Sequence, residues 1–293
     1  MSKKQDNNQE EPDTTGHSWD GIEEYNNPLP RWWVWCLYAT IAWGILYTIA
    51  YPAWPLIKGA TPGLLGYSTR AEVAEDIAAV EAANADLMAK LADVELASIS
   101  DDAELYGFAV NGGAAIFRAN CSQCHGSGAA GATGYPNLLD DDWLWGGTIE
   151  DIAYTVAHGI RNEQSLDSRY SEMTAFDEIL TDEEIDGVVN HVLAISGQDY
   201  DAAAADLGAT VYYDNCAACH GDNGEGVDAL GAPTLNDAIW LYGGDKNSIT
   251  ETVRYARFGV MPAWSEEFRV GSGLSQAEIN AVAAYVHQLG GGE

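Results

Sequence analysis

Four of the five cysteines fall into two identical motifs, and in each motif a histidine directly follows the second cysteine. The motifs are Cys121, Cys124, His125 and Cys216, Cys219, His220. Two thiols at this spacing can reach the two vinyl groups of one porphyrin, and the histidine that follows then lies under the iron. The sequence therefore predicts two covalently bound haem c groups, each attached through two cysteines and ligated axially by one histidine.

Two other chemistries also use cysteine pairs. A zinc site needs all four cysteines to converge on one ion, but these pairs lie in separate, similar segments of the chain. A redox dithiol usually belongs to a βαβ pattern, which this sequence lacks. The fifth cysteine, Cys36, stands alone in an apolar run, so a framework of disulfides is not indicated. Covalent haem attachment explains both motifs best.

An electron-transfer haem needs a second axial ligand, and methionine in that place raises its reduction potential. Met1 is the terminus and Met88 lies in a helical segment, whereas Met173 and Met261 each lie between a haem motif and the last helix of its repeat. We therefore expect Met173 and Met261 to be the sixth ligands; the alternative for a lone methionine is core packing. Because only a short linker at 197–206 joins the repeats, the pairing of methionines with haems stays open.

The haem motifs belong to a repeat that fills the chain from about residue 108. The matching segments are 113–126 with 208–221, 142–147 with 239–244, 149–159 with 249–259, and 180–185 with 274–279. The third pair sets His158 opposite Phe258. No strand alternation of any length appears. We therefore expect a mainly α-helical protein with two tandem domains, at 108–197 and 205–291.

Each repeat ends in a helix with a strong start signal. A hydroxyl residue is followed three positions later by a glutamate, in Thr181 with Glu184 and in Ser275 with Glu278. This capping box satisfies two backbone donors at a helix N-terminus. Both final helices should therefore begin at these residues.

Upstream of the repeat, no charged residue appears between Arg31 and Lys58. Pro52 and Pro55 should end a helix before them, which leaves 32–50, or about 29 Å at ~1.5 Å per residue, the thickness of a bilayer's hydrocarbon core. Aromatic residues gather at both ends of this span, as in interfacial belts. Because thirty polar residues precede it, a signal peptide is a poor fit. The sequence predicts one retained transmembrane helix in contact with membrane lipid.

These observations divide the N-terminal part into three segments. A polar tail, which we expect to be extended, covers 1–30, the transmembrane segment covers 31–57, and a linker covers 58–107. Within the linker, apolar residues at helical spacing predict an amphipathic helix over about 69–98, opened by a capping box of Thr69 and Glu72. Such a helix either lies on its own protein or docks on another subunit, and the sequence favours neither.

The chain is strongly acidic, with 13 Lys and Arg against 45 Asp and Glu and a formal net charge of −32. A polyanion repels nucleic-acid phosphate, so we expect no nucleic-acid partner. The haem-binding part, 108–293, holds 28 of the acids and 7 of the bases. A basic protein partner fits this surface, and adaptation to a saline habitat is the alternative.

The sequence resembles known protein families in two parts of the chain. Residues 108–291 resemble class I cytochrome c, in the order of a first helix with Gly113 or Gly208, the haem motif, a later proline, methionine and a final helix. The N-terminal part is more specific: GHSWDGIEEYNNPLPRWW at 16–33, YPAWPL at 51–56 and GLLGYS at 63–68 resemble the CcoP family, the dihaem subunits of cbb3-type cytochrome c oxidase.

The resemblance implies a bacterial inner-membrane complex that reduces oxygen in aerobic respiration, pumps protons and supports oxidative phosphorylation. In that family the catalytic haem–copper centre lies in another subunit, and a monohaem cytochrome subunit lies between that subunit and the dihaem subunit. This chain would then pass electrons inward from a soluble basic cytochrome c, without an oxygen-reducing site of its own. The alternatives are an anchored dihaem cytochrome of another respiratory reductase or quinol-oxidising complex, and a dihaem peroxidase.

Two further expectations concern topology and the haem surroundings. Covalent haem attachment belongs to the exported side of the membrane, so 58–293 should be periplasmic and 1–30 cytoplasmic. By resemblance to class I cytochromes, the carbonyl oxygens of Pro136 and Pro233 should accept hydrogen bonds from His125 and His220, which fixes the orientation of each imidazole.

Overall fold

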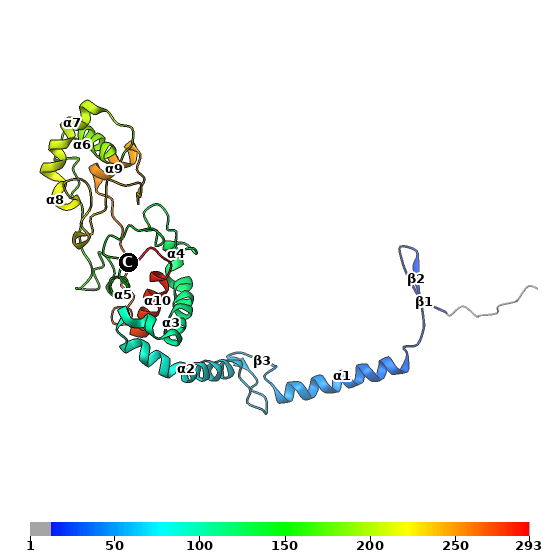
Figure 1. Cartoon of the computed structure of the whole chain (residues 1–293). Helices are drawn as coiled ribbons and strands as arrows, with labels where there is room; N and C mark the ends of the chain where they lie inside the picture. The colour runs from blue at the N-terminus through cyan, green and yellow to red at the C-terminus, as the bar shows by residue number, and fades with distance from the viewer. Residues whose placement is uncertain (1–12, 293) are drawn as a thin grey trace, which may run out of the picture. The chain divides into compact units, whose positions relative to one another are not determined.

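The structure is a computed structural model that describes residues 13–292; residues 1–12 of the predicted tail and Glu293 lie outside the described residues. The chain separates into two units, residues 1–82 and 83–293, which are described in turn. Its elements are shown in Figure 1.

The first unit begins with a β-hairpin that sequence analysis missed. Strand β1 (Thr14–Trp19) pairs antiparallel with β2 (Ile22–Tyr25), so the described part of the tail is not simply extended. Asp20 and Gly21 form the turn, with φ of 52° and 83°. An Asp-Gly pair is the strongest short signal for a two-residue hairpin, because both turn positions need positive φ. The signal was therefore present in the sequence.

Helix α1 (Arg31–Ala50) is the apolar span, with a mean hydropathy of 1.5 and no buried residue. It ends at Ala50, because Tyr51 is extended and Pro52 follows. The predicted end of the helix before Pro52 is thus confirmed, and the remainder of the segment 31–57, from residue 51 onward, is not helical. Beyond the helix, β3 (Pro55–Leu56) and β4 (Gly59–Ala60) form a minimal hairpin.

The chain then folds back onto the end of α1. Leu64 and Leu65 donate backbone hydrogen bonds to the carbonyls of Ile49 and Ala50, at 2.9 and 3.0 Å. Gly63 makes this approach possible: its φ is +70°, and a Cβ there would lie 2.5 Å from the carbonyl oxygen of Ala50. These bonds satisfy carbonyls that a helix end leaves open.

Helix α2 (Thr69–Asp93) is the predicted amphipathic helix. It ends before residue 98, and a 3₁₀ helix, η1 (Leu96–Asp101), follows. The predicted capping box is wrong: Ser68 accepts from the backbone of Ala71 at 3.4 Å, and Glu72 bonds to the hydroxyl of Tyr67. In the second unit, Leu91 is fully buried, and the side-chain amide of Asn280 donates to its carbonyl at 2.7 Å.

The second unit is helical, as expected. Its elements in chain order are α3 (Ala103–Ile116), a π turn η2 (Phe117–Cys121), α4 (Ser122–His125), α5 (Ile149–His158), α6 (Asp182–Ile195), α7 (Ala202–Asn215), α8 (Ala217–His220), η3 (Asp228–Leu230), α9 (Lys246–Tyr255) and α10 (Gln276–His287). Both predicted capping boxes at the starts of α6 and α10 are present.

The two repeats exchange their final helices. Helix α10 packs on α3 and α5 of the first repeat, whereas α6 packs on α7 and α9 of the second. In Figure 1, α10 accordingly lies beside α3, and α6 lies with α7 and α9. We call α3, α4, α5 and α10 the first body, and α6, α7, α8 and α9 the second body. The predicted boundaries 108–197 and 205–291 follow the sequence repeat, whereas the packing follows this exchange.

Glycine lets the helices of each body approach closely. A Cβ at Gly113 on α3 would lie 2.1 Å from the carbonyl oxygen of Ala281 on α10. In the second body, a Cβ at Gly208 on α7 would lie 1.9 Å from the carbonyl oxygen of Gly187 on α6. The first and final helices therefore cross at these glycines, and each crossing joins helices of different repeats.

The structure also corrects one repeat alignment. Helix α5 is capped by Thr148 and α9 by Asp245, whose side chains accept hydrogen bonds from the first turn. Both caps directly follow the Gly-Gly pair that closes the 142–147 and 239–244 segments. The match of 149–159 with 249–259 is therefore out of register. His158 and Tyr255 are the equivalent last residues of the two helices, and Phe258 lies beyond α9.

Candidate haem-binding sites

Each Cys-x-x-Cys-His motif lies in a short helix that follows the first helix of its repeat. The first motif spans the π turn η2 and α4, and the second begins at the C-cap of α7 and ends in α8. All the cysteines are free; the first of each motif is half-buried and the second exposed. Burial, followed by the neighbouring thiol, raises the pKa of Cys121 to about 11 and that of Cys216 to about 11.

The two motif histidines have the same backbone partner. The Nδ1 atom of His125 donates to the carbonyl oxygen of Pro136 at 3.0 Å, and that of His220 to Pro233 at 2.9 Å. Burial lowers the pKa of both imidazoles, and the carbonyl bond opposes this effect only partly. This bond assigns the proton to Nδ1 and leaves the Nε2 lone pair available for a metal ion.

Tight loops bring these carbonyls back under the histidines. The backbone N–H of Gly131 donates to the carbonyl of His125 at 2.8 Å, and that of Gly226 to His220 at 2.9 Å. Both glycines have positive φ, and a Cβ at Gly131 would lie 2.4 Å from the carbonyl oxygen of Tyr135. Glycine is therefore required where each loop turns toward its proline.

The two candidate methionines lie in opposite bodies from those that chain order suggests. Met261, from the second repeat, packs against the core of the first body together with Phe117. Its backbone exchanges two hydrogen bonds with Ile160, both at 3.0 Å. Met173, from the first repeat, packs against the core of the second body. There the N–H of Phe176 donates to the carbonyl of Val253 at 3.1 Å. Each methionine loop thus accompanies its exchanged helix.

Each body therefore contains one complete donor set for a c-type haem: two thiols, an imidazole with free Nε2, and a thioether. The four thiols belong to two motifs, one in η2 and α4 and the other from the C-cap of α7 to α8. These motifs belong to different bodies, so the thiols do not converge as a zinc site requires. The residues present fit a haem c group in each body.

Two aromatic residues that sequence analysis used only as repeat markers lie between the bodies. The indole of Trp145 packs on Gly231, where a Cβ would lie 2.2 Å from the ring. Tyr242 packs on Gly134, where a Cβ would lie 3.3 Å from its ring. Each aromatic residue contacts the loop between the ligand histidine and its proline in the other body. Trp145 and Tyr242 occupy equivalent positions in the two repeats, and this was the sequence signal that could have identified them as functional residues.

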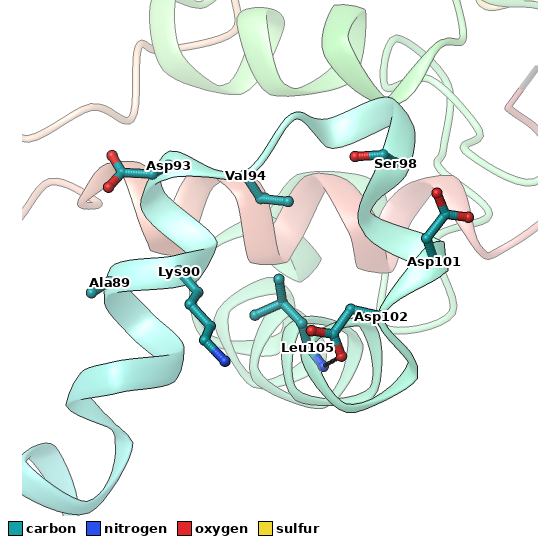
Figure 2. Close-up of a pocket in the computed structure, with 8 residues that line it drawn as sticks. All are labelled: Ala89, Lys90, Asp93, Val94, Ser98, Asp101, Asp102 and Leu105. Carbon is teal, nitrogen blue, oxygen red and sulfur yellow. Dashed lines mark hydrogen bonds between the residues drawn. The ribbon is translucent and has the colours of Figure 1, made fainter.

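A surface pocket lies away from these sites, between the end of α2, η1 and the start of α3 (Figure 2). Its lining residues are Ala89, Lys90, Asp93, Val94, Ser98, Asp101, Asp102 and Leu105. The carboxylate of Asp102 caps α3 by accepting from the N–H groups of Glu104 and Leu105, both at 3.1 Å. The lining includes no cysteine, histidine or methionine, so this pocket is not part of either donor set.

Comparison with known proteins agrees with both parts of the chain. Residues 11–58 match the model of the N-terminal domain of cytochrome oxidase-cbb3, FixP, and residues 110–196 and 205–290 match the cytochrome c model. A cbb3-type cytochrome c oxidase subunit CcoP of Cereibacter sphaeroides is 60% identical over 97% of this chain and 96% of its own length.

Two further relatives cover the chain equally well. The subunit CcoP of Rhodobacter capsulatus is 53% identical over the whole of both chains. The subunit FixP of Azorhizobium caulinodans is 48% identical over 96% of this chain and 94% of its own length. The chain therefore belongs to the CcoP/FixP family of cbb3-type cytochrome c oxidase subunits, and it is a dihaem electron-transfer subunit with two c-type haems.

Proposed function

We propose that each body, which includes the final helix of the other repeat, holds one haem. Cys121 and Cys124 hold the first haem, with His125 and Met261 as its axial ligands. The corresponding set for the second haem is Cys216, Cys219, His220 and Met173. The observation that carries this pairing is the double backbone hydrogen bond between Met261 and Ile160, which ties the Met261 loop to the first body.

Each bound haem supplies a one-electron iron couple, and the residues around it set its properties. The carbonyls of Pro136 and Pro233 hold the imidazoles in one orientation, and the thioethers favour ferrous iron. With both axial positions filled by protein atoms, neither haem has a site for oxygen. We therefore assign this chain a non-catalytic, electron-transferring role and place oxygen reduction at a haem–copper centre in another subunit.

The electron donor that best fits the surface is a soluble basic cytochrome c. The haem-binding part carries four times as many acids as bases, which attracts a cation from a distance. Electrons would then pass through the two haems toward a monohaem cytochrome subunit and the catalytic subunit. The same charge argues against a nucleic-acid partner.

The topology that supports this path places α1 across the membrane lipid of a bacterial inner membrane. Its length and hydropathy suit one crossing, and the aromatic residues at both ends suit the interfaces. We place 58–293 in the periplasm and 1–30 in the cytoplasm, since haem c is attached on the exported side.

The ligand pairing is tested in two backgrounds that each keep one haem. The double variant Cys216→Ala, Cys219→Ala retains only the first haem, and Cys121→Ala, Cys124→Ala only the second. In the first background Met261→His should lower the reduction potential, because imidazole favours ferric iron relative to a thioether, and Met173→His should leave it nearly unchanged. The second background should give the reverse result. The opposite pattern would assign one methionine to each sequence repeat.

A further inference from the structure

Helix α2 carries one apolar stripe, interrupted by a single asparagine, along its whole length. The members of the stripe follow one another at alternating spacings of four and three residues: Val73, Ile77, Val80, Asn84, Leu87 and Leu91. This spacing places them on one face of the helix, at the positions through which two helices pack in a coiled coil. The stripe is therefore suited to contact with another helix.

The C-terminal part of the stripe is covered by this chain. In the second unit, Leu91 is fully buried and Leu87 is half-buried, and both pack against a core that includes residues of α10. The carbonyl of Leu91 also accepts the hydrogen bond from Asn280 of α10. The last turns of the stripe thus have the helical neighbour that its spacing requires.

The N-terminal part of the stripe is exposed. Val73, Ile77 and Val80 expose 56, 53 and 60% of their surface. Ile77 and Val80 also line a shallow hollow together with Asp76 and Glu81. No salt bridge among residues 13–292 involves α2, so these two carboxylates have no cationic partner in the described part of the chain. A contiguous apolar patch with a polar rim is typical of an interaction site.

The charges beside the exposed stripe restrict what can cover it. Asp76 and Glu81 lie on its two opposite sides, and α2 as a whole carries six acids and two bases. A membrane surface is a poor fit, because helices that lie on lipid carry Lys and Arg on their polar face. A second copy of α2 is also disfavoured, because in a parallel pair Asp76 of one copy would face Glu81 of the other. A helix with basic residues beside its apolar face complements both the stripe and its carboxylates.

We propose that Val73, Ile77 and Val80, with Asp76 and Glu81 at their sides, form a docking surface for an amphipathic helix of another subunit of the oxidase. That helix carries Lys or Arg on both sides of its own apolar face. We call these five residues the α2 docking surface. The proposal rests on membership of a family of oxidase subunits, and it does not depend on which methionine ligates which haem.

The first test uses the full chain in the membrane-bound oxidase, with the photo-cross-linking amino acid p-benzoylphenylalanine in place of Ile77. Illumination should join this position to a peptide of another oxidase subunit, which mass spectrometry identifies after digestion. The peptide should combine an apolar helical face with Lys or Arg beside it. The same amino acid in place of Ala82 is the matched control, because Ala82 is exposed and lies on the opposite face of α2. This control should give no such product.

The second test reverses the charges beside the stripe and measures the yield of the cross-link from position 77. The double variant Asp76→Lys, Glu81→Lys sets like charges against a basic partner and should lower the yield about tenfold. The double variant Glu75→Lys, Asp86→Lys changes the net charge equally on the opposite face and should leave the yield unchanged. All four side chains are exposed, so unchanged haem content should confirm that both variants fold.

The proposal is wrong if position 77 joins to a second copy of this chain, to its own haem-binding part, to lipid alone, or to no subunit of an oxidase that co-purifies with the chain. An acidic peptide as the product would also contradict it. Equal losses of yield in the two double variants would attribute the effect to net charge instead of the α2 docking surface. A chain that co-purifies with no other oxidase subunit would contradict the assignment to the oxidase as well, so the two failures are distinguishable.

Discussion

Met261 and Ile160, which come from different repeats, are joined by two backbone hydrogen bonds of 3.0 Å. Such a pair fixes the height of the methionine loop on the first body independently of any side chain. The first site is therefore assembled from both halves of the haem-binding region. A substitution in either repeat should therefore affect this site.

Removal of a proposed thioether ligand should open one haem to external ligands. In the Met261→Ala variant, carbon monoxide should bind to the ferrous iron of one haem per chain, and in the Met173→Ala variant to that of the other haem. Each substitution leaves one axial position of the iron empty. The reduced spectrum with and without carbon monoxide measures this. Binding by both haems of the parent chain would contradict the assignment.

Two adjacent glycines on α3 should respond oppositely to alanine. Gly113→Ala places a Cβ 2.1 Å from the backbone of α10 and should destabilise the first body by about 1–3 kcal/mol. Gly112→Ala meets nothing within 4 Å and should stabilise the helix by roughly 0.5–1 kcal/mol. Thermal unfolding compares the two. Equal melting temperatures would show that α10 does not cross α3 at this glycine.

Asp142 should make the contact between the bodies sensitive to pH. Burial, then the charges of Asp237, Asp140 and Asp228, raises the pKa of Asp142 to about 6. Because the folded protein binds this proton more tightly than the unfolded chain, the carboxyl favours folding when protonated and opposes it as the pH rises through about 6. Asp142→Asn should therefore stabilise the protein at pH 7.5.

The gain should be on the order of 1 kcal/mol after solvent screening, and it should vanish near pH 4. Thermal unfolding of the variant and the parent at both pH values measures it. Asp141→Asn, at the exposed neighbour, is the matched control for the loss of one charge. A gain of the same size from Asp141→Asn would attribute the effect to net charge alone.

Salt should slow electron delivery from a basic cytochrome c. The acidic surface steers a cationic donor, and ions screen this attraction beyond about 8 Å at physiological ionic strength. The second-order rate of haem reduction should fall steadily as sodium chloride is raised. A rate that does not change with ionic strength would favour salt tolerance as the role of the charge.

Reporter fusions can decide the orientation of α1. Alkaline phosphatase fused after Lys58, in the exposed turn of the β3–β4 hairpin, should be active because it folds only on the exported side. A fusion after Asn27, before the helix, should be inactive. An inactive fusion after Lys58 would reverse the topology.

Local patterns predicted local structure well. The capping boxes at Thr181 and Ser275 mark where α6 and α10 begin, and the apolar span ends at Ala50 before Pro52. The carbonyl partners of His125 and His220 were predicted from the resemblance to class I cytochromes, and both hydrogen bonds are present. These features depend on neighbours in the chain, so their signals are visible without the fold.

The sequence carried no such signal for the partner of each final helix, because that pairing depends on contacts between distant segments. The two final helices have similar apolar faces, and both first helices carry a glycine at the crossing, so the repeat pattern allows either partner. Only the packing distinguishes Gly113 against Ala281 from a contact within one repeat. The contacts of Trp145 with Gly231 and of Tyr242 with Gly134 were missed for the same reason, because they join residues that lie far apart in the chain.

The exchange of α6 and α10 makes the second body an insertion within the first. The first body is discontinuous, since its helices lie on both sides of the segment from Met173 to Tyr255. That segment begins and ends side by side, because Phe176 and Asp177 donate to the carbonyls of Val253 and Arg254 at 3.1 and 3.2 Å. During synthesis the inserted body can therefore close as soon as α9 has emerged, whereas the core around α3 stays open until α10 arrives. The first haem motif therefore acquires its complete core after the second, because α10 is the last helix to be synthesised. Closing this longer loop also costs more chain entropy.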